Sequence, residues 1–269
     1  MLVGSGGAPR AAIAMGKKDH DTAEKIVGNC FTLLTGLAVI LTILFYISAP
    51  TLLKLFGASS VTMSYATAYA RIYILGSFFV LIVLGMNPFI TTQGFAKISM
   101  MTTVIGAVIN IILDPVFIFV LGMGVRGAAL ATVLSQAVGA IWILRFLTGK
   151  KTILRLTKEN MRLEVRVFGP CLALGISTFV MLSTESLLSI SFTNSLSRYG
   201  GDVAVGAMTI ITSINQLVAM PVQGICQGGQ PIISYNYGAD KPERVKKAFF
   251  TQFCACVAYT FTFWAVIML

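Results

Sequence analysis

The chain has 269 residues, of which 56% are hydrophobic and only 11% are charged, whereas roughly 25% of the residues are charged in an ordinary soluble domain. This composition excludes a soluble enzyme. The formal net charge of +10 does not indicate nucleic acid as a partner, because the basic residues lie in short segments between apolar runs, as membrane topology requires.

The apolar runs predict helices that cross a membrane. The first 15 residues resemble the end of a helix whose beginning is missing, and a charged loop is expected from Gly16 to Lys25. Each later run is long enough to cross about 30 Å of hydrocarbon, and none alternates as a barrel strand does. The sequence therefore predicts an all-α polytopic membrane protein with spans at residues 28–50, 66–91, 98–121, 127–147, 167–196, 205–235 and 248–269.

The basic residues are divided unequally between the two ends of the predicted bundle. Alternate connections hold 15 Lys and Arg residues at one end and four at the other, and cytoplasmic loops carry such an excess. We therefore expect a multi-pass protein embedded in the lipid bilayer of the cytoplasmic (cell) membrane. Its predicted cytoplasmic loops are residues 16–26, 92–98, 147–166 and 237–247.

The longest and most charged of these connections divides the chain into two parts. The predicted organisation is a first lobe over residues 1–149, a cytoplasmic linker over residues 150–166 and a second lobe over residues 167–269.

An internal repeat supports this division. Gly6-Gly7-Ala8-Pro9 with Gly16 is matched by Gly228-Gly229-Gln230-Pro231 with Gly238, at a constant offset of 222 residues. Interrupted helices at corresponding positions of two halves are typical of transporter binding sites, and a chance match in a glycine-rich chain is the alternative. Pro9 and Pro231 are therefore candidate gating residues, and Pro115, inside the predicted span 98–121, is a further one.

Asp114 and Glu185 are the carboxylates that fall inside predicted spans, where an unpaired charge is costly enough to suggest a function. Asn110 lies four residues before Asp114 and so on the same helical face, and Pro115 cannot donate to the carbonyl of Ile111. These oxygens suit a small hard cation, so Asp114 and Asn110 are candidate Na⁺ ligands. Burial of the carboxylate also favours its protonated form, which suits a proton carrier. A hydrogen bond from Asp114 to a neighbouring helix is the structural alternative.

Other polar groups are less specific. Glu185 is flanked by hydroxyl residues in the second lobe, where a second coupling site and a hydrogen-bonded structural role are both open. Gln227 and Gln230 precede Pro231 near the end of a span and are candidate gating or lobe-interface residues. Tyr65 and Tyr69 are typical of a membrane-interface anchor, and stacking on aromatic cations is the alternative.

Several patterns are dismissed by their context. The run from Gly122 to Gly127 fits G-x-G-x-x-G but follows an apolar span, so it is not a dinucleotide site. His20, the one histidine, lies in a charged segment, and no P-loop sequence occurs. We expect no cofactor, and a gradient must supply the energy for any transport.

Three motifs resemble those of the MATE (multidrug and toxic compound extrusion) transporters of prokaryotic type. They are Gly4-Ser5-Gly6-Gly7-Ala8-Pro9 followed by Gly16, Asn110-Ile111-Ile112-Leu113-Asp114-Pro115, and the run from Gln227 to Ala239. The resemblance implies a two-lobe helical bundle with repeated six-helix halves. The chain would then be a fragment that covers the end of helix 2 to helix 9.

The same resemblance implies a cation- or proton-coupling site in the first lobe. It falls on Asn110 and Asp114, with Thr132 in the next helix and Asn87 in the helix before. Simple interhelical hydrogen bonding is the alternative for Thr132 and Asn87. A further aspartate expected in helix 1 is missing from this sequence.

The implied function is a secondary active antiporter that exports drugs or organic cations in exchange for Na⁺ or H⁺ and is monomeric when complete. A lipid-linked oligosaccharide flippase of the same superfamily is a second reading, although it should carry more basic residues inside its spans, where Arg10 is nearly alone. A non-transporting membrane protein is a third.

Overall fold

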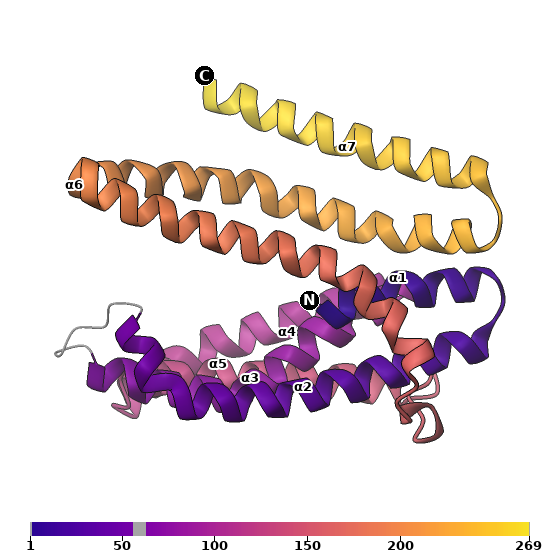
Figure 1. The fold of residues 1–269 in the computed structure, drawn as a ribbon, viewed down its shortest axis with the longest axis horizontal. Helices are drawn as coiled ribbons and strands as arrows, with labels where there is room; N and C mark the ends of the chain where they lie inside the picture. The colour runs from indigo at the N-terminus through magenta and orange to yellow at the C-terminus, as the bar shows by residue number, and fades with distance from the viewer. Residues whose placement is uncertain (1, 56–62, 269) are drawn as a thin grey trace.

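The computed structural model describes residues 2–55 and 63–268, and every regular element in these ranges is helical. Figure 1 shows α2 to α5 gathered on one side of the molecule, α6 and α7 on the other, and α1 between the two groups. In chain order the elements are α1 (Leu2–Gly16), α2 (His20–Leu55), α3 (Met63–Thr92), α4 (Ala96–Pro115), the π-helical η1 (Val116–Val120), α5 (Val125–Leu147), the short η2 (Glu159–Met161), α6 (Val165–Gly238) and α7 (Pro242–Met268).

Within the described ranges, seven helical segments have the length and hydropathy of membrane spans, at residues 20–54, 63–92, 96–120, 125–147, 165–193, 206–238 and 242–268. Each overlaps one predicted span, although residue 269 of the last predicted span lies outside the described residues. The prediction of an all-helical multi-pass membrane protein is confirmed.

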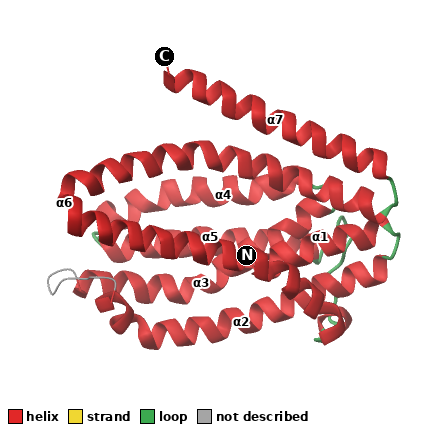
Figure 2. Cartoon of the chain, turned by 45° about the horizontal axis from the view of Figure 1, so that its top comes forward, coloured by secondary structure: helices red, strands yellow, loops and turns green. Residues whose placement is uncertain are grey.

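Helix α6 holds two of these spans. It reverses direction at Gly201, whose φ of 63° and ψ of −165° form a conformation that glycine adopts readily because it has no Cβ. Figures 1 and 2 both show the two legs of α6 running in opposite directions from this reversal.

The connections are shorter than the sequence suggested. The predicted loops 16–26, 92–98 and 237–247 shrink to turns at residues 17–19, 93–95 and 239–241, because their charged residues form helix ends instead. His20 is the first residue of α2 and is not in a loop. Asp19 starts that helix by accepting a hydrogen bond from the Thr22 N–H at 3.0 Å, as an N-cap residue does.

Four connections lie at one end of the bundle, which we call the basic end: the three short turns 17–19, 93–95 and 239–241, and the longer connection 148–164. Hydrogen bonds from the Thr152 hydroxyl to Gln93 and from the Arg155 N–H to Glu24, together with close packing of Gly16 on Tyr235, bring them together. The structure thus groups the connections that sequence analysis assigned to one side of the membrane.

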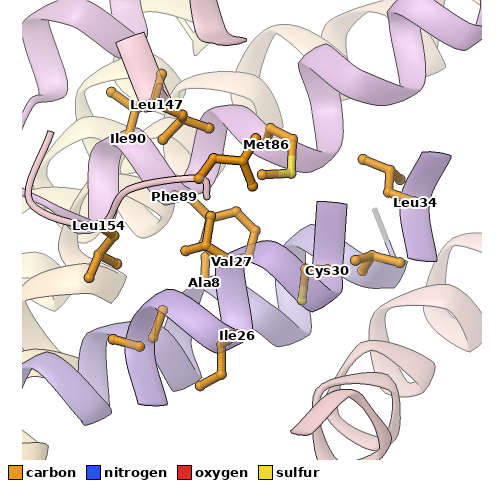
Figure 3. Packing of buried hydrophobic residues seen from close by; sticks show 14 of the residues in the cluster. Ala8, Ile26, Val27, Cys30, Leu34, Met86, Phe89, Ile90, Leu147 and Leu154 are labelled. Atoms are coloured by element: carbon orange, nitrogen blue, oxygen red, sulfur yellow. The ribbon is translucent and has the colours of Figure 1, made fainter. Parts of the chain in front are cut away.

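The core lies where α1, α2 and α3 meet (Figure 3). Phe89 and Met86 of α3 are fully buried there. Gly7 of α1 makes room for Phe89 and for Cys30 of α2, since a Cβ at this position would lie 2.6 Å from the Cys30 Sγ and 2.7 Å from the Phe89 Cζ. Small residues at such crossings let helices approach closely, which matters in lipid because packing, and not water exclusion, drives helix association there.

Candidate functional site

Two unpaired polar atoms on α4 mark the candidate site. The Asp114 Oδ1 and the Asn110 Nδ2 are buried, and neither has a hydrogen-bond partner. An unsatisfied buried polar atom is costly and therefore calls for an explanation. The structural alternative, in which Asp114 bonds a neighbouring helix, is not what the structure shows for its Oδ1.

The backbone is irregular directly after Asp114. Pro115 ends α4, the Val116 N–H bonds the Leu113 carbonyl, and the chain continues as the π-helix η1, in which the Leu121 N–H bonds the Val116 carbonyl at 2.9 Å. Proline removes one helical hydrogen bond, and π segments are frequent at functional sites. The carboxylate thus lies beside a helix segment that is already disrupted.

Thr132 of α5 lies at the level of Asn110. Packing of Gly106 against the Ser135 carbonyl, with a Cβ-to-oxygen distance of 3.8 Å, and of Gly127 against Phe117 fixes how α4 and α5 align. Thr132 falls between these two contacts. Its hydroxyl donates to the Ala128 carbonyl at 3.0 Å, which leaves the oxygen's lone pairs available.

Two tyrosines of α3 join this region. Tyr69 lies within electrostatic range of Asp114, and its ring stacks on Tyr73 with centroids 5.9 Å apart. Tyr65 is 65% exposed, as an interface anchor would be. The sequence treated Tyr65 and Tyr69 alike; only their four-residue spacing hinted at a common face, and the packing of α3 on α4 separates their roles.

Asn87 lies elsewhere. Its Nδ2 donates to the Ser99 carbonyl at 3.4 Å, near the start of α4, while its Oδ1 is buried without a partner. Ser99 precedes Asp114 by 15 residues, which is about 22 Å along a straight helix. The structure therefore does not bring Asn87 to Asp114, and its contact matches the alternative of interhelical hydrogen bonding.

Glu185 is exposed on the first leg of α6. The flanking hydroxyls of Thr184 and Ser186 donate to the carbonyls of Val180 and Leu182, so they do not donate to the Glu185 carboxylate. No hydrogen bond joins Glu185 to another residue in the described part of the chain. It lies on α6, in the predicted second lobe, and is not part of the Asp114 region.

Gln227 and Gln230 face α7. They line a notch of about 400 Å³, into which the Gln252 side chain extends with its Oε1 buried and unpartnered. The contact between α6 and α1 is formed at two places: by Tyr235 and Gly238, beyond Pro231, and by Cys171 and Gly175 on the first leg of α6. The gating or interface role of the two glutamines stays a prediction.

The Asp114 region can hold a small cation or a proton. It offers the carboxylate of Asp114 and the side-chain amide of Asn110, whose oxygen takes the place of the nitrogen if the amide rotates by about 180°. The hydroxyls of Thr132 and Tyr69 belong to the same region. Such hard oxygen ligands suit Na⁺. The described residues contain no group of three His, Cys, Asp or Glu side chains placed to hold a metal.

Comparisons with known proteins agree on one family. The MatE family model matches residues 1–116 and 177–269. The multidrug export protein MepA of Staphylococcus saprophyticus is 26% identical over an alignment 269 positions long, which covers 97% of this chain and 59% of MepA. The chain thus spans less than two thirds of that relative's length.

Two solved structures have the same fold. The MATE multidrug transporter DinF-BH in complex with R6G is 34% identical with a TM-score of 0.87, over 100% of this chain and 60% of DinF-BH. A multidrug resistance MATE family transporter of the MOP superfamily, in an outward-facing conformation, is 27% identical with a TM-score of 0.89 over the same shares.

Proposed function

The chain belongs to the MATE family, whose members are transporters and not enzymes. We propose that it acts as a secondary active antiporter. The protein exports drugs or organic cations across the cytoplasmic membrane in exchange for Na⁺ or H⁺. Small amphipathic or cationic molecules are its substrates, and the basic end faces the cytoplasm.

The observation that carries this proposal is the pair of unpaired buried atoms on Asp114 and Asn110. A coupling ion that binds there satisfies the carboxylate, and its departure leaves the charge uncompensated in a low-dielectric setting. Occupancy thereby changes the relative stability of conformations of α4, whose regular structure ends at Pro115. Such a differential interaction is what couples an ion to a conformational change.

The internal repeat supports alternating access. Gly16 and Gly238 occupy equivalent positions in the repeat and pack against each other's helices at the basic end. This contact closes the basic end between the two groups of helices, in keeping with the likeness to a transporter in an outward-facing conformation. Rocking of two repeats around a central site is the usual mechanism of such folds.

Dye export tests the coupling role. The full-length protein is expressed in cells that lack their own drug pumps, and export of a cationic dye is followed under an imposed Na⁺ or H⁺ gradient. Asp114→Asn should abolish gradient-driven export, while Asp240→Asn, in the exposed turn at the basic end, should leave it intact. Undiminished export by Asp114→Asn would exclude Asp114 as the coupling group, and the ion whose gradient drives export identifies the coupling ion.

A further inference from the structure

The connection between the two groups of helices, residues 148–164, is a fixed strap and not a loose loop. Its first half is held by one buried side chain. The Gln93 Oε1 accepts hydrogen bonds from the Thr152 hydroxyl at 2.7 Å, the Ile153 N–H at 2.7 Å and the Leu154 N–H at 2.9 Å. The end of α3 therefore sets the path of the strap.

The second half of the strap is bound to α2. Glu24 accepts from the Arg155 N–H at 3.0 Å and from the Asn160 Nδ2 at 3.2 Å. Asn29 accepts from the Glu164 N–H at 2.7 Å, and the Thr32 hydroxyl donates to the Met161 carbonyl at 2.8 Å. Both halves of the strap are thus anchored to α2 and α3. The strap contributes backbone groups and the side chains of Thr152 and Asn160 to these hydrogen bonds, and none of its basic side chains takes part in them.

Side chains alternate along the extended part of the strap. Thr152, Leu154 and Leu156 are buried, so the residues between them point outward, as the twofold period of an extended chain requires. The outward and exposed positions of the strap and of the first two residues of α6 carry basic and apolar side chains together: Lys151, Ile153, Arg155, Lys158, Arg162, Leu163, Val165 and Arg166. Ile153, Leu163 and Val165 are 44%, 52% and 72% exposed.

We propose that this outward face, the strap face, binds the headgroups of anionic phospholipids in the adjacent leaflet. The strap joins the end of one membrane span, Leu147, to the start of the next, Val165, so connectivity places it at the membrane surface. Its five basic side chains complement lipid phosphates, and its exposed apolar side chains fit the interface below them. Two acidic groups, Glu159 and Glu164, are exposed nearby and leave a net positive face.

The mixture of groups favours lipid over a soluble polyanion. A nucleic acid would be matched by basic residues alone, whereas exposed aliphatic side chains beside basic ones are typical of segments that lie in a membrane interface. Because the strap backbone is already fixed, little ordering entropy is lost on binding. Each Lys or Arg near an anionic surface contributes about 1 kcal/mol, a roughly fivefold preference.

The two tryptophans provide a local test. Trp142 lies near the end of α5 that leads into the strap and is 38% exposed, whereas Trp264 lies near the end of α7, far along the chain. The full-length protein carrying Trp264→Phe is placed in phosphatidylcholine vesicles, and brominated phosphatidylglycerol is added to quench Trp142. Matched measurements use Trp142→Phe, with Trp264 as reporter.

We expect the quenching to show that phosphatidylglycerol binds next to Trp142 roughly tenfold or more tightly than phosphatidylcholine. The preference next to Trp264 should be much smaller. Replacing Lys151, Arg155 and Lys158 together by Gln should reduce the preference at Trp142 to within about twofold. The charge-matched control Lys241→Gln, Lys246→Gln and Lys247→Gln, at the same basic end, should leave it unchanged.

A second measurement needs no substitution in the strap. Raising the salt concentration to about 1 M shortens the screening length to about 3 Å and should remove the preference at Trp142. Equal preferences at the two tryptophans would overturn the proposal. So would a preference at Trp142 that survives the strap substitutions or the high salt.

Discussion

Gly16 and Gly238, which the sequence repeat places at equivalent positions, pack against each other's helices in a reciprocal contact. A Cβ on Gly16 would collide with the carbonyl oxygen of Tyr235, and one on Gly238 with the carbonyl oxygen of Ile13. Ile13 and Tyr235 are themselves separated by the repeat offset of 222 residues. The two crossings are therefore the same contact made twice, as a local twofold axis between α1 and α6 requires.

The repeat extends into each group of helices. A Cβ on Gly7 would lie 2.6 Å from the Cys30 Sγ, and one on Gly229 would lie 2.8 Å from the Gln252 Cδ. Both pairs again match at the same offset. At the equivalent positions, the Cys30 thiol packs against Gly7 in one half and the Gln252 amide packs against Gly229 in the other.

Filling the reciprocal crossing should separate α1 from α6. We expect Gly16→Ala or Gly238→Ala to destabilise the protein by about 1–3 kcal/mol, since the new methyl group meets backbone atoms that cannot rotate away. Gly224→Ala on the same helix α6 is the matched control, because nothing lies within 4 Å of its Cβ position.

Thermal unfolding in detergent measures both variants. The control should be stabilised by up to about 1 kcal/mol, because alanine loses less conformational freedom than glycine in a helix. If the melting temperature rose in Gly16→Ala or Gly238→Ala as it does in the control Gly224→Ala, α1 and α6 would not be in close contact at these glycines.

Gln93 should be the strongest single anchor of the strap. Gln93→Leu leaves the N–H groups of Ile153 and Leu154 buried and unpaired, which we expect to cost about 2–4 kcal/mol. Thr152→Val removes one hydroxyl and leaves both N–H bonds to Gln93 in place, so its cost should be about 1 kcal/mol.

Hydrogen exchange of the strap amides separates these effects. Exchange at residues 153 and 154 should accelerate strongly in Gln93→Leu and little in Thr152→Val. Equal protection in both variants would mean that packing of Leu154 and Leu156 alone holds the strap.

Tyr69 should contribute to ion coupling if the proposed function is correct. Tyr69→Phe removes a hydroxyl that lies within electrostatic range of Asp114, and we expect the apparent affinity for the coupling ion to fall roughly fivefold, as the loss of about 1 kcal/mol implies. Tyr65→Phe, at an exposed position of the same helix, is the control. The dependence of dye export on Na⁺ concentration and pH reports the affinity, and matching curves for the two variants would remove Tyr69 from the site.

Acid should weaken the start of α2. Hydrogen bonds from the side chain and backbone N–H of Thr22 hold the pKa of Asp19 below its usual value. The stabilisation is therefore fully present above the ordinary aspartate pKa and is lost as the pH falls through the lowered pKa of the folded state. The difference in melting temperature between the unsubstituted protein and Asp19→Ala should be constant near neutral pH and shrink in acid.

Asp19→Asn provides the control, because asparagine also caps helices but does not titrate. Its advantage over Asp19→Ala should persist in acid. A difference that grows as the pH falls would have the wrong sign for a carboxylate cap.

The candidate site was only partly visible in the sequence. Asn110 and Asp114 could be paired because they are four residues apart on one helix, and that spacing fixes their common face. Thr132 depended on the family resemblance. Tyr69 and Asn87 could not be sorted, since both lie on α3 and only the antiparallel packing of α3 on α4 decides which of them lies near Asp114.

The class of protein, the spans, the division of basic residues between the two ends and the repeat can all be read from the sequence alone. The spans are visible there because the thickness of the hydrocarbon sets how long and how apolar each run must be. Helix packing is needed to know which glycines meet, that residues 148–164 are anchored by Gln93 and Glu24, and which polar atoms stay unpaired. These depend on helix alignments set by packing in lipid, which no periodicity along one helix records.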